Sequence, residues 1–108
     1  MELNEYQNKA LETAVYPKEH SIIYPTLGLT GEAGEVSDKV KKVLRDKGGL
    51  FDEETKKAIA MEVGDVCWYI ATLAHDLGYT LEEICQMNYE KLKSRQQRDK
   101  LHGSGDNR

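Results

Sequence analysis

Residues 58–74 read AIAMEVGDVCWYIATLA, and this stretch decides the fold. Its apolar side chains recur at alternating spacings of four and three residues, which is the period of an α-helix. Only two charged residues, Glu62 and Asp65, interrupt it. A helix that is apolar nearly all round is buried on more than one side. In a chain of 108 residues we therefore expect a helical bundle that a second subunit completes.

Working outward from this stretch, four helices account for most of the chain. Asn4 is the expected N-cap of the first helix, Pro17 ends it, and the pair Gly48-Gly49 stops the second. We predict one all-α domain spanning residues 1–108, whose residues 101–108 form a flexible tail. The expected helices are roughly 4–15, 25–47 (beginning at Pro25 or Thr26), 52–77 and 80–100, the last opened by the capping box from Thr80 to Glu83.

Composition limits the classes of function. A net charge of −4 argues against a nucleic-acid-binding surface. No apolar run approaches the ~20 residues that cross a bilayer, and the N-terminus lacks the basic and apolar pattern of a signal peptide, so we expect a cytoplasmic protein without a membrane partner. Cys67 and Cys85 form no Cys-x-x-Cys motif, and their apolar neighbours predict two buried thiols.

A short phrase occurs twice, thirty residues apart: EAGEV at 32–36 and EVGDV at 62–66. Residues three apart share one helix face, so Glu32 and Glu35 form one acidic pair, and Glu62 and Asp65 form another. Adjacent helices would bring the four carboxylates together. Two carboxylates ~5 Å apart repel by roughly 3 kcal/mol at an effective dielectric near 20, so such a cluster requires a cation. An ordinary solvated face is the alternative.

The donor set indicates which cation fits. An all-carboxylate site favours Mg²⁺ or Mn²⁺ over zinc or copper. Di-iron bundles use Glu-x-x-His pairs, and no histidine follows these acids at that spacing. Mg²⁺ commonly binds substrate phosphates, which points to phosphate-ester or anhydride chemistry. The glycines of residues 28–34 do not form a phosphate-binding loop, because the Gly-Lys-Ser/Thr ending is missing.

Other residues repeat at the same thirty-residue offset. Lys39 and Tyr69 each follow the second acid of a pair by four residues, so both are expected to point between the acids. Gly34 and Gly64 match on the opposite side. A glycine inside a helix costs roughly 1 kcal/mol relative to alanine, so these two predict a close approach of helix backbones.

The pattern Glu32-x-x-Glu35, twenty-six residues, then Glu62-x-x-Asp65 resembles the signature of the MazG-like, all-α nucleoside triphosphate pyrophosphohydrolases. The resemblance runs from the second helix through residues 88–95. One departure concerns Gly31, where many members carry the first of two consecutive glutamates. That departure leaves open the number of metal ions and which glutamate acts as the base.

The resemblance implies a homodimer or a dimer of dimers, and Mg²⁺-dependent cleavage of an NTP or dNTP to the monophosphate and pyrophosphate. Water would attack the α-phosphorus, and the cellular role would be house-cleaning of the nucleotide pool. All four acids would bind Mg²⁺, with Mn²⁺ as a substitute. They would also be the catalytic residues: Glu32, Glu35, Glu62 and Asp65.

The fourth helix turns polar and basic on the side that begins as its core face. We interpret Asn88, Lys91 and Arg95 as substrate-binding residues that close over the acids and hold the triphosphate. The alternative is a helix end that carries cations favourably. Lys39 is a weaker candidate for phosphate binding. Tyr69 is expected at the sugar or base.

Trp68 is expected at a dimer contact rather than under the base. Two other functions stay open: phosphoribosyl-ATP pyrophosphohydrolase activity, and a non-catalytic helical dimerisation module. The first keeps the chemistry and changes the substrate. The second treats the acids as merely solvated and predicts no stabilisation by Mg²⁺.

Overall fold

The computed structural model describes residues 1–98 and 103–105, and within these residues it contains helices and no strand. This confirms the all-α prediction. The predicted tail at 101–108 falls mostly outside the described residues. The elements in chain order are α1 (Leu3–Leu11), the 3₁₀ helix η1 (Lys18–His20), α2 (Ile23–Asp46), α3 (Glu53–Asp76) and α4 (Leu81–Gln97).

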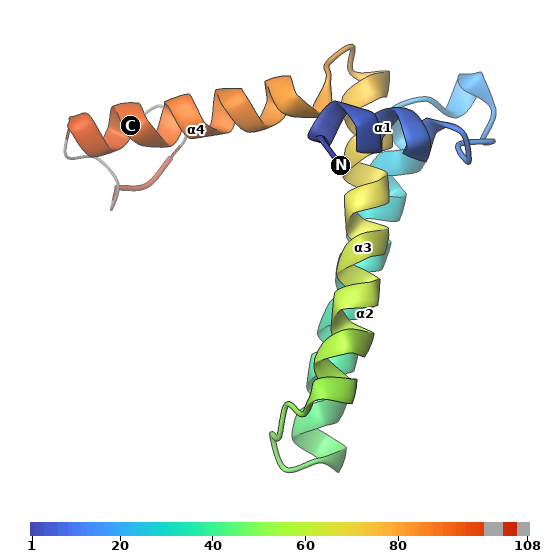
Figure 1. Ribbon diagram of the computed structural model, residues 1–108, viewed down its shortest axis with the longest axis vertical. Helices are drawn as coiled ribbons and strands as arrows, with labels where there is room; N and C mark the ends of the chain where they lie inside the picture. Colours follow the sequence, from blue (N-terminus) through green and yellow to red (C-terminus); the bar gives the residue numbers. More distant parts are fainter. Residues whose placement is uncertain (99–102, 106–108) are drawn as a thin grey trace.

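The two longest helices, α2 and α3, lie side by side as an antiparallel hairpin (Figure 1). α1 packs across the C-terminal end of α3, and α4 leaves that same end and projects away from the hairpin (Figure 1). The hairpin is therefore the part of the chain that positions residues of α2 against residues of α3. No helix of the described part is long and apolar enough to cross a membrane.

The starts of α3 and α4 lie where local side-chain chemistry predicts them. The Asp52 side chain accepts a hydrogen bond of 2.8 Å from the Thr55 backbone N–H at the start of α3. Thr80 and Glu83 form the predicted capping box of α4. Each side chain satisfies backbone donors that the first helical turn leaves unpaired. The expected end of α4 near Lys100 lies outside the described residues.

The prediction for α1 is wrong at both ends: the helix ends at Leu11 instead of near residue 15, and its start differs because a polar side chain there serves the tertiary structure. Glu2, not Asn4, is the N-cap. The Asn4 amide oxygen instead accepts the backbone N–H of Glu82 at 3.0 Å. Gln7 is buried and bonds three backbone groups, including the Ala71 carbonyl and the Leu81 N–H. These bonds fasten α1 to the junction of α3 and α4.

The start of α2 is fixed by a carboxylate at the end of α3. Ile22 adopts φ 70°, which is costly for a β-branched residue. Asp76 Oδ2 accepts the Ile22 backbone N–H at 3.0 Å and the Tyr16 hydroxyl at 2.8 Å. Burial and this hydrogen bond raise the pKa of Tyr16 to about 12. α2 consequently begins at Ile23, two residues before the predicted Pro25.

The core of one chain is small. It centres on Ala10, Ala71 and Leu81, with Tyr6 and Trp68 packed against it. The chain exposes 7922 Å², whereas a folded monomer of 12.3 kDa exposes about 6100 Å². Its radius of gyration is 16.8 Å, against about 13 Å for a compact domain of this length. A single copy thus leaves an unusual amount of apolar surface uncovered.

The predicted burial of α3 is only partly correct. Val63, Ile70 and Leu77 belong to the expected apolar stripe, yet all three are exposed in the single chain. The prediction that Cys67 and Cys85 are buried is wrong. Both thiols line an open apolar cavity between α1, α3 and α4, because α4 projects away instead of folding over α3.

Candidate functional site

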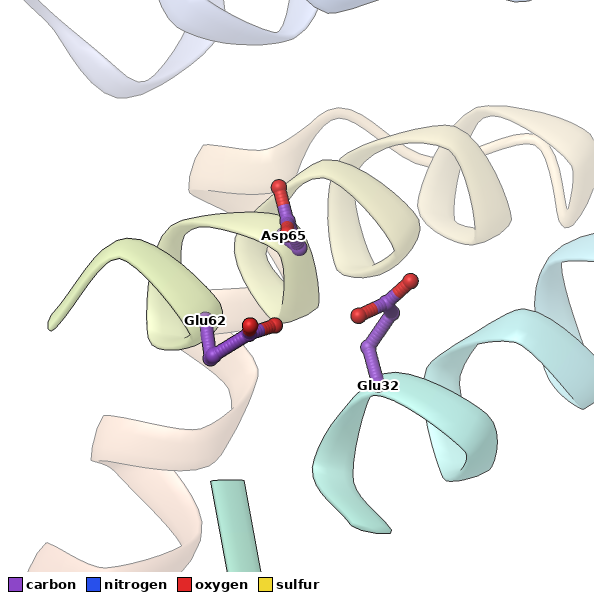
Figure 2. Close-up of side chains that lie close together, drawn as sticks. All are labelled: Glu32, Glu62 and Asp65. Carbon is purple, nitrogen blue, oxygen red and sulfur yellow. The ribbon is translucent and has the colours of Figure 1, made fainter. Parts of the chain in front are cut away.

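Three of the four predicted acids meet across the α2–α3 hairpin. Glu32 extends from α2 toward Glu62 and Asp65 on α3 (Figure 2). One oxygen from each of the three carboxylates lies within 4.8 Å of the others. Glu32 and Glu62 are half-buried, and Asp65 is exposed. We call these three residues the acidic cluster.

Glu35, the fourth predicted acid, does not belong to this closest group. It lies one turn beyond Glu32 on α2, and its side chain is exposed. Its charge still reaches the cluster, because it contributes to the raised pKa of Glu32. Helical spacing places both glutamates on one face, and the pairing with α3 brings only Glu32 against Glu62 and Asp65.

The acidic cluster is electrostatically unfavourable as it stands. Partial burial is the largest cause that raises the pKa of Glu32, followed by repulsion from Asp65, Glu62 and Glu35. One ammonium group is close: Lys39 Nζ lies 3.7 Å from Glu62 Oε1. This ion pair crosses the hairpin and places Lys39 beside the acids, as predicted. A single lysine offsets only part of the negative charge.

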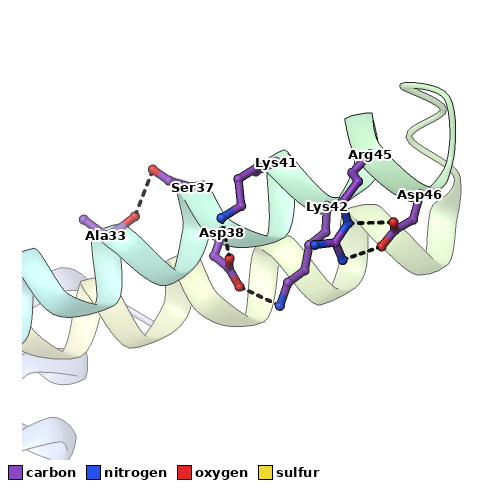
Figure 3. A network of polar contacts seen from close by, with 7 residues as sticks. All are labelled: Ala33, Ser37, Asp38, Lys41, Lys42, Arg45 and Asp46. Atoms are coloured by element: carbon purple, nitrogen blue, oxygen red, sulfur yellow. Dashed lines mark hydrogen bonds and ion pairs between the residues drawn. The ribbon is translucent and has the colours of Figure 1, made fainter.

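The next turns of α2 carry as many charges, but there each acid has a nearby partner (Figure 3). Asp38 pairs with Lys42 at 2.8 Å and with Lys41 at 3.3 Å. Arg45 donates two hydrogen bonds, of 2.7 and 2.8 Å, to Asp46. These bonds lower the pKa of both aspartates. We call this set the turn-proximal ion pairs.

A cavity of about 390 Å³ opens directly beside the acidic cluster. Glu32 and Asp65 form one part of its lining, and Thr13, Trp68 and Tyr69 form the rest. The cavity therefore joins carboxylates to aromatic rings. The rings suit a flat apolar group, and the carboxylates would accept an anionic group such as a phosphate only through a bound cation.

The indole of Trp68 is held in a fixed orientation at this cavity. Its Nε1–H donates a hydrogen bond of 2.8 Å to Thr13 Oγ1, and the Thr13 hydroxyl donates in turn to the Ala10 carbonyl at 2.9 Å. The ring meets Tyr69 edge to face, with centroids 4.9 Å apart. The dimer contact expected for Trp68 stays a prediction, and in the single chain its indole forms part of the cavity wall.

Tyr69 is held on its other side by α2. A β-carbon built on Gly28 would overlap the Tyr69 ring, so this position requires glycine. Tyr24 lies 6.4 Å from Tyr69, between ring centroids, and stacks on Tyr16 at 4.8 Å. Partial burial raises the pKa of the Tyr69 hydroxyl, and Tyr24 adds to the shift.

The glycine that packs closely against a neighbouring helix is therefore Gly28, which no sequence pattern indicated. Gly34 and Gly64 were predicted to mark a close approach of backbones, and within the single chain that prediction is wrong. A β-carbon at either position would meet no atom within 4 Å. Both glycines are exposed in the single chain.

The predicted substrate residues of α4 do not reach the acidic cluster of their own chain. α4, which carries Asn88, Lys91 and Arg95, projects away from the hairpin (Figure 1), and none of these three residues lines the cavity beside the acidic cluster. Asn88 and Lys91 are exposed, and Arg95 is buried at 4% exposure. Within one chain, the acidic cluster and its cavity are formed by residues of α2 and α3 and by Thr13, which follows α1.

The family model described as the MazG nucleotide pyrophosphohydrolase domain matches residues 22–98, which include the acidic cluster and the cavity residues of α2 and α3. The chain is also similar to the Gene 37 protein of Mycobacterium phage L5. The two are 45% identical over 114 aligned positions that cover the whole of both chains. No solved structure matches the chain.

Proposed function

The chain belongs to the MazG nucleotide pyrophosphohydrolase family, and from this premise we propose that it hydrolyses a nucleoside or deoxynucleoside triphosphate with the help of Mg²⁺. The products are the nucleoside monophosphate and pyrophosphate. The observation that carries the proposal is the acidic cluster, in which Glu32, Glu62 and Asp65 converge from two helices. Family membership alone supports the class of activity, and the cluster supports the place where it occurs.

The donor set of the acidic cluster fits a hard divalent cation. Oxygen ligands lie about 2.1 Å from Mg²⁺, so those of one ion are at most about 4.2 Å apart. The carboxylate oxygens lie within 4.8 Å of one another, so small side-chain rotations suffice. Glu32, Glu62 and Asp65 would hold the ion, with Glu35 one turn away. Mn²⁺ fits the same donors.

The proposed chemistry follows from the negative charges of the acidic cluster and of the substrate phosphates. A bound divalent cation would lower the pKa of a coordinated water and offset the charge of the phosphate oxygens. The water oxygen forms a bond to the α-phosphorus as the bond to the α,β-bridging oxygen breaks. Pyrophosphate leaves with that electron pair. A glutamate of the motif accepts the proton that the water loses.

The cavity beside the cluster is proposed as the nucleoside site. Trp68 and Tyr69 line it together with Glu32 and Asp65, so a base against the aromatic rings would leave its phosphates at the carboxylates. The hydrogen bond to Thr13 keeps the indole in place before a ligand arrives. Stacking of a base on an aromatic ring contributes roughly 1–3 kcal/mol.

We further propose that two or more copies assemble, because a single chain exposes too much apolar surface. Val63, Ile70 and Leu77 on α3 would then be covered. An α4 helix from another copy would bring its Asn88, Lys91 and Arg95 toward the phosphates, which the α4 of the same chain does not do. The mass of the assembly in solution distinguishes a dimer from a tetramer.

The deciding experiment identifies the products. Purified protein is incubated with canonical, deoxy and damaged nucleoside triphosphates and with phosphoribosyl-ATP, in Mg²⁺, Mn²⁺ or a chelator. We expect pyrophosphate with either metal ion and none with the chelator. Orthophosphate as the direct product would contradict attack at the α-phosphorus. Turnover of phosphoribosyl-ATP alone would indicate the alternative enzyme, and no turnover of any compound would favour a non-catalytic module.

A further inference from the structure

Lys39 is the one cationic side chain of the described residues that forms an ion pair with the acidic cluster. Its Nζ lies 3.7 Å from Glu62 Oε1, across the hairpin. That distance is within reach of an ion pair but beyond the 2.7–3.2 Å of an N–H···O hydrogen bond. The two side chains are 39% and 21% exposed, so the contact is reached by solvent. Lys39 and Glu62 thus form a loose pair that another cation can displace.

The neighbouring lysines are held more firmly. Lys42 contacts Asp38 at 2.8 Å, and Lys47 donates a hydrogen bond of 2.8 Å to Thr55 Oγ1. These lysines and Lys39 line a second cavity of about 220 Å³, which the three acids of the cluster do not line. Lys39 therefore belongs to the wall of this second cavity and also contacts the acidic cluster through Glu62.

The short distances around Glu62 also point to an exchange. A divalent cation held by Glu32, Glu62 and Asp65 would share Glu62 with Lys39. The ion and the ammonium group of Lys39 are then like charges at short range, and the ammonium group, which has only this one loose contact to the cluster, is repelled. The flexible four-carbon stem of lysine lets the ammonium group move without disturbing α2.

We propose that Lys39 is an exchangeable counterion of the acidic cluster. It pairs with Glu62 while the cation site is empty, and it gives up Glu62 when a divalent cation binds. The released ammonium group then contacts a phosphate of the nucleotide. This inference rests on the proposed function, because it assigns a sequence of partners to one residue of the same site.

The proposal predicts opposite effects of one substitution on two affinities. Lys39→Met keeps the length of the side chain and removes its charge. We expect the variant to bind Mg²⁺ roughly two- to fivefold more tightly in the absence of nucleotide, because nothing competes for Glu62. With Mg²⁺ present, we expect it to bind the α,β-imido analogue of a triphosphate substrate roughly tenfold more weakly. Isothermal titration calorimetry on the full chain measures both.

Lys42→Met is the matched control, since it removes a lysine of the same cavity that is paired with Asp38; both affinities should stay near wild type. Circular dichroism checks that each variant is folded, and Lys39→Gln provides a second neutral side chain. The counterion role would be overturned if both affinities changed in the same direction, or if neither affinity changed. Failure of the wild-type protein to bind Mg²⁺ would overturn both this inference and the proposed function, whereas normal binding with an unchanged Lys39→Met would overturn this inference alone.

Discussion

The α2–α3 hairpin contains two charged regions that lie only a few turns apart and differ in how their charges are balanced. In the turn-proximal ion pairs, Asp38 and Asp46 contact cations at 2.7–2.8 Å, and their pKa values are lowered. In the acidic cluster, Glu62 contacts the ammonium group of Lys39 at 3.7 Å, no ion pair within the described residues involves Glu32 or Asp65, and the pKa of Glu32 is raised. The same helices thus hold one balanced set of charges and one surplus.

The difference separates carboxylates that are paired with cations of the same chain from carboxylates whose charge is mostly unpaired. Exposed ion pairs such as those around Asp38 contribute little to stability and need nothing further. A carboxylate surplus beside an aromatic cavity instead lowers stability until a cation arrives. A carboxylate whose pKa is raised by partial burial and by neighbouring acids, as that of Glu32 is, marks a candidate functional site when it lines a cavity. The comparison therefore favours the acidic cluster, and not the turn-proximal ion pairs, as the place of the proposed activity.

The largest expected contrast between the two regions is catalytic. Glu62→Gln removes a charge and a metal donor from the acidic cluster, and we expect the rate of pyrophosphate release to fall by at least about 100-fold. Asp46→Asn removes a charge from the turn-proximal ion pairs, and its rate should stay within about twofold of wild type. Steady-state assays with saturating Mg²⁺ compare the two variants.

Equal losses in these two variants would show that the overall charge of the hairpin matters, rather than the cluster. Full activity of Glu62→Gln would refute the metal assignment. The elution volume of each variant in gel filtration serves as the control, because a change in assembly would alter the rate for another reason.

The second contrast concerns stabilisation by Mg²⁺. A ligand present at 100 times its dissociation constant stabilises a fold by about 2.7 kcal/mol, which raises the melting temperature of a small domain by roughly 10 °C. We expect this gain in the wild-type protein and in Asp38→Asn, and its loss in Glu32→Gln. Differential scanning calorimetry with and without Mg²⁺ measures it. A gain that survives in Glu32→Gln would place the ion elsewhere.

The fold was predictable where side chains act on their own helix. Asp52 and the capping box from Thr80 to Glu83 bond backbone groups three residues away, so their roles follow from sequence alone. Asn4 has the same capping chemistry, but its amide bonds Glu82, 78 residues along the chain. The choice between a local and a distant partner depends on how α1 packs, which the local pattern does not contain.

The candidate site divides in a similar way. Helical spacing and the thirty-residue repeat were enough to predict that Glu32, Glu62 and Asp65 lie close together. The requirement for glycine at Gly28 was not predictable, because it arises from the Tyr69 ring on another helix. The direction of α4 was missed because it depends on contacts of α1 with the junction before α4, and not on any periodic pattern.

The smallest expected contrast is in the dependence of stability on pH without metal. The hydrogen bonds of Asp38 to Lys42 and Lys41 lower its pKa, so its contribution is present above its unfolded pKa of about 3.9 and is lost as the pH falls through the lowered folded value. Asp38→Asn should therefore reduce the melting temperature at pH 7 and at pH 5 alike, and the difference should close only below about pH 4.

Glu32 should show the opposite sign, because partial burial and then the neighbouring acids raise its pKa. Its ionised form costs stability at pH values above the folded pKa, and protonation removes that cost as the pH falls through this value. Glu32→Gln should raise the melting temperature at pH 7, and the gain should fade toward acidic pH. Thermal melts in a chelator from pH 7.5 to pH 4 test both variants. A loss of stability in Glu32→Gln at pH 7 would mean that the charge of Glu32 is already balanced in the metal-free protein, and the two regions of the hairpin would then no longer differ in the way the cation site requires.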